Sequence, residues 1–356
     1  MHRAAVLMLI LGALPAAGTD AATREWSFTV HDPDRPDRHV AAAAIGPAEP
    51  VGPCPLLVLG HATMTPWTHY RYLAEPLAAA GWLVLLPDTE TGLVADQAAL
   101  ADDMLLLVDL VRERPDDLPV DLPEVAGPWA LLGHSLGGGA AVLAAAAGDP
   151  GALVALAPQE RARPSMLARA GDVAAPALVI SGELDCITPP DAHHAPLHAG
   201  LAATPRAHAV LAGGGHCAFA TPCEPCTGAE AGCPPELEVA EQQARTRALV
   251  EPWLAWHVRG DETAREAFLA AAGMADVTVD LVEPPTAAPV PVGAVRLVLV
   301  DAGHGSGHVR WRLEASDARP VRATLHDLRG RLVRRLVTSH ADRSEERRVG
   351  KECATG

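Results

Sequence analysis

The stretch Trp129-Ala130-Leu131-Leu132-Gly133-His134-Ser135-Leu136-Gly137-Gly138 decides the fold of this chain. Its four leading apolar residues predict a strand, and an alanine-rich run over 140–147 predicts a helix just after the glycines. A strand, the pattern Gly-x-Ser-x-Gly and a helix together form a nucleophile elbow. We therefore predict that Ser135 is a catalytic nucleophile, and that a side chain at Gly133 or Gly137 would collide with neighbouring backbone. The alternative is a glycine-rich turn without a catalytic role.

Short apolar runs alternate with helical patterns on both sides of this turn. Two strands are expected within 23–45, around a polar, proline-broken turn. Further strands are expected at 55–60, 82–86, 129–134, 152–156, 177–181 and 207–211, and helices at 70–80, 95–112 and 235–259. This alternation predicts an α/β fold with a doubly wound, mostly parallel sheet and helices on both of its faces.

The pattern changes after about residue 272. A proline-rich run from Glu283 to Pro291 predicts a linker, and four short apolar runs beyond it predict a small all-β module. The expected parts are a catalytic domain over 23–275, a linker over 276–293 and a β-sandwich-like module over 294–342. Residues 343–356 resemble a translated sequencing adapter and are left out of the fold prediction as an artefact, which would leave the module truncated.

The N-terminus has the three parts of an export signal. A basic start at 1–3 precedes an apolar core at 4–14 and a run of small residues at 15–18. The apolar core is too short to anchor the chain across a bilayer, and no later run is long enough to do so. We predict a signal peptide over 1–22 and a secreted, periplasmic or cell-surface protein of a bacterium. A buried N-terminal helix is the alternative.

Composition limits the partners of the chain. The 356 residues carry a formal net charge of −16, and the body of the chain has no basic cluster. This argues against nucleic acid and against anionic membrane surfaces as partners. Apolar residues make up 49% of the chain, which supports a folded core.

A serine nucleophile needs a base, and the base needs a carboxylate to orient it. In chains with this elbow the acid and then the histidine follow the serine. Asp185 comes shortly after the strand expected at 177–181 and is the predicted acid, with Glu183 as its rival. His216 follows the strand expected at 207–211 after three glycines and is the predicted base.

The oxyanion formed by attack on a carbonyl needs backbone N–H donors. One is expected from Leu136, the residue after the nucleophile. The other is expected from the loop after the strand at 55–60, where Thr63 is favoured over Ala62. The neighbouring His61 is interpreted as a residue that shapes this loop.

Several runs around these residues resemble the α/β-hydrolase fold, and within it the dienelactone hydrolase-like and cutinase or polyester hydrolase branch. The matching runs, within about 25–272, are Gly60 to Thr63, Leu73 to Pro87, Gly133 to Gly139, Ala157-Pro158-Gln159, Gly182 to Pro189 and Gly215-His216-Cys217. The resemblance implies a Ser-His-Asp esterase with these roles on Ser135, His216 and Asp185.

Two departures from that pattern concern the chemistry and the substrate. Dienelactone hydrolases proper use a cysteine nucleophile, whereas this chain has serine. Polyester hydrolases carry an aromatic residue soon after the Ala-Pro-Gln run, whereas this chain has Glu160-Arg161-Ala162-Arg163, which favours a more polar substrate. The expected C-terminal module resembles the immunoglobulin-like or sorting modules of secreted bacterial enzymes, which implies surface attachment.

The predicted function is an exported serine hydrolase that cleaves small-molecule or polymeric carboxylic esters through an acyl-enzyme, without a cofactor or metal. Two alternatives stay open. One is an amidase or peptidase on the same triad, and the other is a catalytically inert surface binding protein.

The chain has seven cysteines, at positions 54, 186, 217, 223, 226, 233 and 353. Without Cys353, in the excluded tail, six remain, and disulfides are the default in an exported chain. Cys186 follows the predicted acid and Cys217 the predicted base, so a Cys186–Cys217 bridge is predicted to join the two loops. The loop with Cys223, Cys226 and Cys233 is expected to be held by bridges of its own, with Cys54 as a possible partner. Zinc held by these three cysteines with a fourth ligand is the alternative.

Overall fold

The structure is a computed structural model that describes residues 22–161 and 163–284, together with the backbone of five strands between 295 and 349. The chain divides into two compact units, Met1–Pro284 and Pro285–Gly356. The predicted signal peptide lies outside the described residues except for Ala22. None of the helices within the described ranges is both long and apolar enough to cross a membrane.

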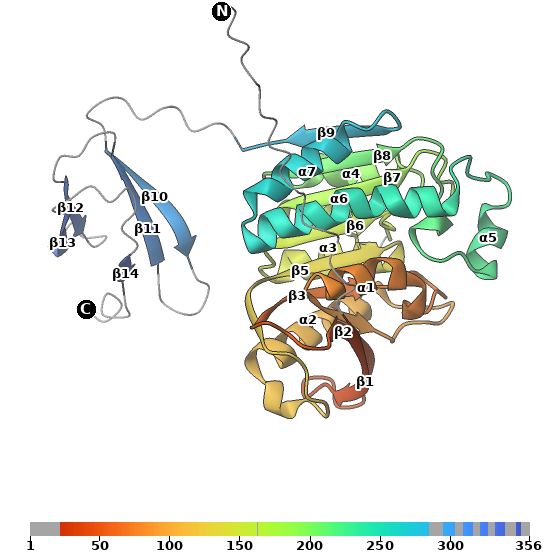
Figure 1. The fold of residues 1–356 in the computed structure, drawn as a ribbon, viewed down its shortest axis with the longest axis horizontal. Coiled ribbons are helices and arrows are strands. Elements are labelled where there is room, and N and C mark those ends of the chain that lie inside the picture. Colours follow the sequence, from red (N-terminus) through yellow and green to blue (C-terminus); the bar gives the residue numbers. More distant parts are fainter. Residues whose placement is uncertain are drawn as a thin grey trace, which may run out of the picture. The chain divides into compact units, whose positions relative to one another are not determined.

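A nine-stranded sheet forms the centre of the first unit (Figure 1). Its strands lie in the order β1-β2-β4-β3-β5-β6-β7-β8-β9. Strands β4 to β8 in this order are parallel, while β1, β2 and β9 are antiparallel to their neighbours. The bounds are β1 (Thr23–His31), β2 (His39–Pro47), β3 (Cys54–Gly60), β4 (Leu83–Pro87), β5 (Val125–His134), β6 (Ala152–Leu156), β7 (Ala177–Gly182), β8 (Arg206–Leu211) and β9 (Val277–Val282). The predicted doubly wound, mostly parallel sheet is confirmed.

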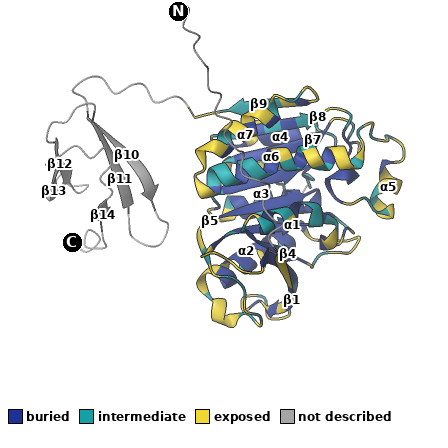
Figure 2. Cartoon of the chain, viewed as in Figure 1, coloured by how far each residue is buried: buried dark blue, intermediate teal, exposed yellow. Residues whose placement is uncertain are grey.

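Helices cover both faces of this sheet, so that its central strands are buried (Figure 2). Leu131 and Leu132, adjacent in β5, belong to different cores because successive side chains of a strand point to opposite faces. One core includes α2 and α3, and the other includes α1, α6 and α7. The helices are α1 (Arg71–Ala79), α2 (Gln97–Glu113), α3 (Leu136–Ala147), α4 (His194–Gly200), α5 (Glu224–Glu230), α6 (Val239–Arg259) and α7 (Glu262–Ala272).

The far edge of the sheet differs from the prediction. The linker predicted over 276–293 is wrong at its start, because Val277–Val282 forms β9. This strand pairs antiparallel with β8, from Leu211 opposite Val277 to Arg206 opposite Val282. Val277 is the one buried residue of β9, so the strand lacks the buried apolar run by which the inner strands are recognised.

The second unit contains only strands among its described residues. β10 (Val295–Ala302), β11 (Val309–Ala315) and β14 (Arg347–Val349) form one sheet, and β12 (Val321–His326) pairs with β13 (Leu332–Thr338). The four strands expected in this region are present. Their assembly into a sandwich stays a prediction, and so does the origin of residues 343–356, which include β14.

Candidate active site

Ser135 occupies the sharp turn between β5 and α3. Its backbone has φ 55° and ψ −116°, a strained conformation for a residue with a side chain, and its exposed fraction is 5%. The Ser135 N–H donates to the carbonyl of Leu156 (3.0 Å), and its own carbonyl accepts from Gly139 (3.0 Å) and Gln159 (2.8 Å). These hydrogen bonds to β6, α3 and the loop after β6 hold the strained turn in place.

The glycines of the elbow are required by close backbone contacts. A Cβ atom on Gly133 would lie 2.0 Å from the carbonyl oxygen of Gly137. One on Gly137 would lie 2.2 Å from the carbonyl oxygen of Gly60. The predicted collision is therefore confirmed at both positions, since real atoms do not approach this closely.

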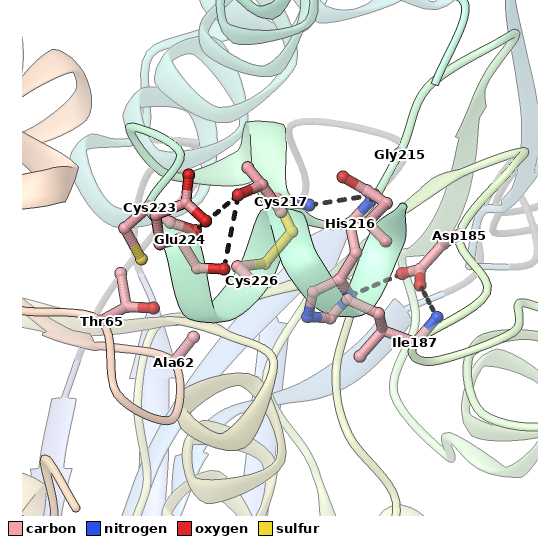
Figure 3. The surroundings of a disulfide bond; sticks show 12 residues. Ala62, Thr65, Asp185, Ile187, Gly215, His216, Cys217, Cys223, Glu224 and Cys226 are labelled. Atoms are coloured by element: carbon pink, nitrogen blue, oxygen red, sulfur yellow. Dashed lines mark hydrogen bonds and ion pairs between the residues drawn. A yellow bond between two sulfur atoms is a disulfide. The ribbon is translucent and has the colours of Figure 1, made fainter. Parts of the chain in front are cut away.

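Asp185 and His216 form a buried pair (Figure 3). Nδ1 of His216 lies 2.7 Å from Oδ2 of Asp185, and the residues are 2% and 3% exposed. Oδ1 of Asp185 accepts the backbone N–H groups of Ile187 (2.9 Å) and Thr188 (2.8 Å). Burial alone would raise the pKa of Asp185, but the hydrogen bonds from His216 and Thr188 bring it below its ordinary value.

Glu183, the rival acid, does not make this contact. It is exposed, and its Oε2 accepts the N–H of Gly213 at 2.9 Å. Its position one residue beyond β7 directs it to Gly213, early in the loop after β8, rather than to the side chain of His216.

The elbow and the His216 loop are neighbours in space. The imidazole rings of His134 and His216 lie 4.8 Å apart between centroids, and His134 directly precedes Ser135. Ser135, Asp185 and His216 follow β5, β7 and β8, whose carboxyl ends lie at one edge of the parallel sheet. The structure therefore brings the three predicted residues to the same edge.

The loop after β3 is organised by Tyr70. Its fully buried hydroxyl accepts the N–H of Ala62 (2.9 Å) and lies 2.9 Å from Nδ1 of His134. Burial lowers the pKa of His134 well below its usual range, so the ring is neutral and its Nδ1 accepts a hydrogen bond from the Tyr70 hydroxyl. The N–H of Ala62 is thus occupied, which leaves Thr63 as the candidate donor in this loop. Leu136 begins α3, where the helix supplies no acceptor for its N–H.

The disulfides differ from the prediction. The structure pairs Cys217 with Cys226 (Figure 3) and Cys186 with Cys233, so the predicted Cys186–Cys217 bridge is wrong. The physical reason is that the segment around α5 lies against both loops and is bonded to each of them. The zinc alternative is inconsistent with this pairing, because Cys226 and Cys233 are both oxidised. Cys54 and Cys223 are free among the described cysteines.

The α5 segment also supports the histidine through a residue that sequence reasoning missed. Glu230, 5% exposed at the end of α5, accepts the N–H groups of His216 (2.5 Å) and Cys217 (3.3 Å) with Oε1. Gln242 of α6 bonds both backbone groups of Gly215, at 2.9 and 2.8 Å. The backbone on both sides of His216 is therefore fixed by side chains from two helices. No motif marks either residue.

Removal of the longer disulfide is expected to cost more stability than removal of the shorter one. The bridges close segments of 47 and 9 residues. Chain entropy then predicts losses of about 4 kcal/mol for Cys186→Ser with Cys233→Ser, and about 2.5 kcal/mol for Cys217→Ser with Cys226→Ser. Urea unfolding of the variants measures the difference. The free Cys223, replaced by serine, is the control, and equal losses for both pairs would contradict the expectation.

Acid is expected to destabilise the fold from about pH 6.5 downward. Burial lowers the pKa of His194 to about 3 and of His208 and His257 to about 4, from 6.5. Below pH 6.5 the unfolded chain binds protons that the folded chain does not, so the free energy of unfolding falls by roughly 1.4 kcal/mol per pH unit for each histidine. Urea titrations at pH 7.5, 6 and 5 test this. His257→Phe should flatten the slope, and stability independent of pH over this range would refute the expectation.

The segment after β6, where the chain departs from polyester hydrolases, is bonded to the protein itself. The Glu160 N–H donates to Nδ1 of His193 (2.9 Å), and its carboxylate accepts the N–H of Leu167 (3.1 Å). The Arg161 guanidinium donates to the carbonyl of Ala95 at 2.9 Å. Both charged side chains therefore have partners in the fold.

A doubly wound sheet, a serine on a strained strand-to-helix turn and a buried His–Asp pair at the same sheet edge are the features of an α/β-hydrolase-type enzyme. The family model PETase, described as PET hydrolase-like, matches residues 47–227, more than half of the chain. The chain belongs to this PET hydrolase-like family and is a carboxylic ester hydrolase. The match bears out the polyester hydrolase side of the resemblance and does not extend to the second unit. A search of curated proteins finds no match.

Proposed function

We propose that the chain hydrolyses esters with a Ser-His-Asp triad made of Ser135, His216 and Asp185. The observation that carries this proposal is the buried pair of His216 and Asp185, 2.7 Å apart, next to the elbow that holds Ser135. An Asp185 carboxylate that accepts the Nδ1 proton leaves Nε2 of His216 free to act as the base.

The reaction then runs in two halves. His216 takes the hydroxyl proton of Ser135 while the serine oxygen attacks the ester carbonyl. The N–H groups of Leu136 and Thr63 donate to the resulting oxyanion. His216 returns the proton to the departing alcohol, which leaves an acyl-enzyme. Water, deprotonated by His216, attacks this acyl group, and Ser135 recovers its proton as the acid is released.

The substrate we propose is an ester without a large aromatic acyl group. Glu160 and Arg161 stand where polyester hydrolases carry an aromatic side chain, and their hydrogen bonds to Leu167 and Ala95 hold them against the protein. This segment therefore offers no aromatic face for a substrate ring to stack on.

We also propose that the enzyme is exported. The two disulfides support this, because such bonds persist in oxidising compartments. The signal-like N-terminus points to the same location. The strands after residue 294 resemble surface-attachment modules, and attachment to the cell surface is part of the proposal.

Turnover and labelling together test the function. The mature protein is assayed on p-nitrophenyl esters of increasing acyl length and on matched p-nitroanilides, and a fluorophosphonate probe is mapped by mass spectrometry. Ester turnover with the probe on Ser135 is expected. Preference for the anilides would favour an amidase or peptidase. Neither turnover nor labelling would overturn the proposal and favour a binding protein.

A further inference from the structure

A line of hydrogen bonds runs from Asp185 through Thr188 and α4 to β7 and β8. Oγ1 of Thr188 lies 2.8 Å from Oδ2 of Asp185 and 3.2 Å from Nε2 of His194. Oγ of Ser181 lies 2.8 Å from Nδ1 of His194 and 2.7 Å from Nε2 of His208. Thr188, His194 and Ser181 have no exposed surface, so water does not compete for these contacts. The proposed reaction uses none of these four side chains.

The direction of the first hydrogen bond follows from the charge of Asp185. An ionised carboxylate can only accept, so Thr188 donates its hydroxyl proton to Oδ2. The carbonyl of Ala157 also lies 3.2 Å from Oγ1. If the proton pointed there instead, lone pairs of Thr188 and Asp185 would face each other at 2.8 Å. With its only proton used, Oγ1 of Thr188 can bond His194 only as an acceptor.

The remaining directions follow one from another. Burial lowers the pKa of His194 to about 3, so its ring is neutral and carries one proton. Because Thr188 must accept, that proton is on Nε2, and Nδ1 is left to accept the hydroxyl proton of Ser181. Oγ of Ser181 then accepts from Nε2–H of His208, a half-buried histidine whose pKa is also lowered, to about 4. Every donor in the line points toward Asp185.

We propose that Thr188, His194, Ser181 and His208 are positioning residues that form a one-way hydrogen-bond relay onto the catalytic acid. The proposal rests on the proposed function for its kinetic consequence. The relay fixes the Thr188 hydroxyl, which lies 3.0 Å from Nδ1 of His216 as well as 2.8 Å from Asp185. A hydroxyl aimed at Asp185 stabilises the carboxylate when His216 becomes cationic, whereas a misdirected one would compete for the Nδ1 proton.

Kinetics of two single variants and their combination test the relay. Thr188→Val keeps the shape but removes the hydroxyl, and is expected to lower kcat about 10- to 100-fold with KM within about twofold. His194→Phe is expected to lower kcat about tenfold. The double variant should be no slower than Thr188→Val alone, because His194 acts only through Thr188. An independent, multiplicative loss in the double variant would overturn the relay.

Two conservative variants and one control separate positioning from folding. Thr188→Ser keeps the hydroxyl, and His194→Gln can place an amide N–H near the position of Nε2, so both should recover most of kcat. His257→Phe replaces a half-buried histidine outside the line, on α6 against Trp253, and should leave kcat unchanged. If the enzyme hydrolyses esters and kcat is unchanged in Thr188→Val or His194→Phe, the relay is refuted. The proposed triad of Ser135, His216 and Asp185 would not be affected by that result.

The tautomers give a readout that needs no ester turnover. Nitrogen-15 NMR of histidine-labelled protein at pH 7, assigned through His194→Phe and His208→Phe, should show both rings neutral and protonated at Nε2. A proton on Nδ1 of His194 would overturn the proposed direction whether or not the protein is active. Loss of ester turnover with the expected tautomers would instead count against the proposed function alone.

Discussion

Replacement of Ser135 by alanine is expected to lower kcat for ester hydrolysis by about a thousandfold or more. The substitution removes the atom that attacks the carbonyl and leaves the turn intact, because alanine is smaller and the backbone hydrogen bonds of residue 135 do not involve its hydroxyl. KM should change far less than kcat, and the fluorophosphonate probe should no longer attach. Steady-state kinetics on the preferred p-nitrophenyl ester measure both constants.

Two further variants make this result specific. Ser27→Ala, on the exposed side of edge strand β1, should leave kcat unchanged. His216→Ala should lose about as much activity as Ser135→Ala, and the double variant little more, because the residues of a triad act as one unit. Residual activity near that of the unmodified enzyme in Ser135→Ala would place the nucleophile elsewhere in the chain.

Asp185→Asn is expected to lower kcat by about 10⁴-fold while the protein stays folded. The amide oxygen will take the place of Oδ1, where the N–H groups of Ile187 and Thr188 require an acceptor. The amide nitrogen then faces Nδ1 of His216, which must accept, so the ring proton moves to Nε2. A histidine protonated at Nε2 cannot take the proton of Ser135.

Glu183→Gln is the matched control, because Glu183 is the other carboxylate on the same loop. Its contact is to Gly213, outside the pair, so kcat should stay within a few-fold of the original. Circular dichroism and thermal unfolding establish that both variants are folded. A larger loss in Glu183→Gln than in Asp185→Asn would assign the acid to Glu183.

The local sequence was enough to predict the elements of this fold that are determined by neighbouring residues and by burial. The elbow could be predicted because its backbone contacts at Gly133 and Gly137 admit only glycine. The inner strands could be predicted because both of their faces are buried, which requires continuous apolar runs. Strand β9 could not be predicted in this way. It is an edge strand that pairs only with β8 and has one buried residue, so its sequence contains no continuous apolar run.

The support of the site could not be predicted, because it depends on contacts between distant segments. Spacing placed Cys186 and Cys217 beside the acid and the base, but their partners lie in a segment whose position is set by tertiary packing. Glu230 reaches His216 from 14 residues away along the same segment. The relay joins β7, β8 and α4 through histidines that look like any others in a chain with 16 of them.

The antiparallel direction of β9 decides at which edge of the catalytic sheet the chain leaves toward its C-terminal unit. β9 starts opposite Leu211, at the carboxyl end of β8, and finishes opposite Arg206, at its amino end. The chain therefore leaves the catalytic sheet on the side away from Ser135, Asp185 and His216. A surface, resin or fusion partner joined just after Pro284 would therefore attach at the edge of the sheet opposite the catalytic residues. The edge with Ser135, Asp185 and His216 would stay accessible to substrate in solution.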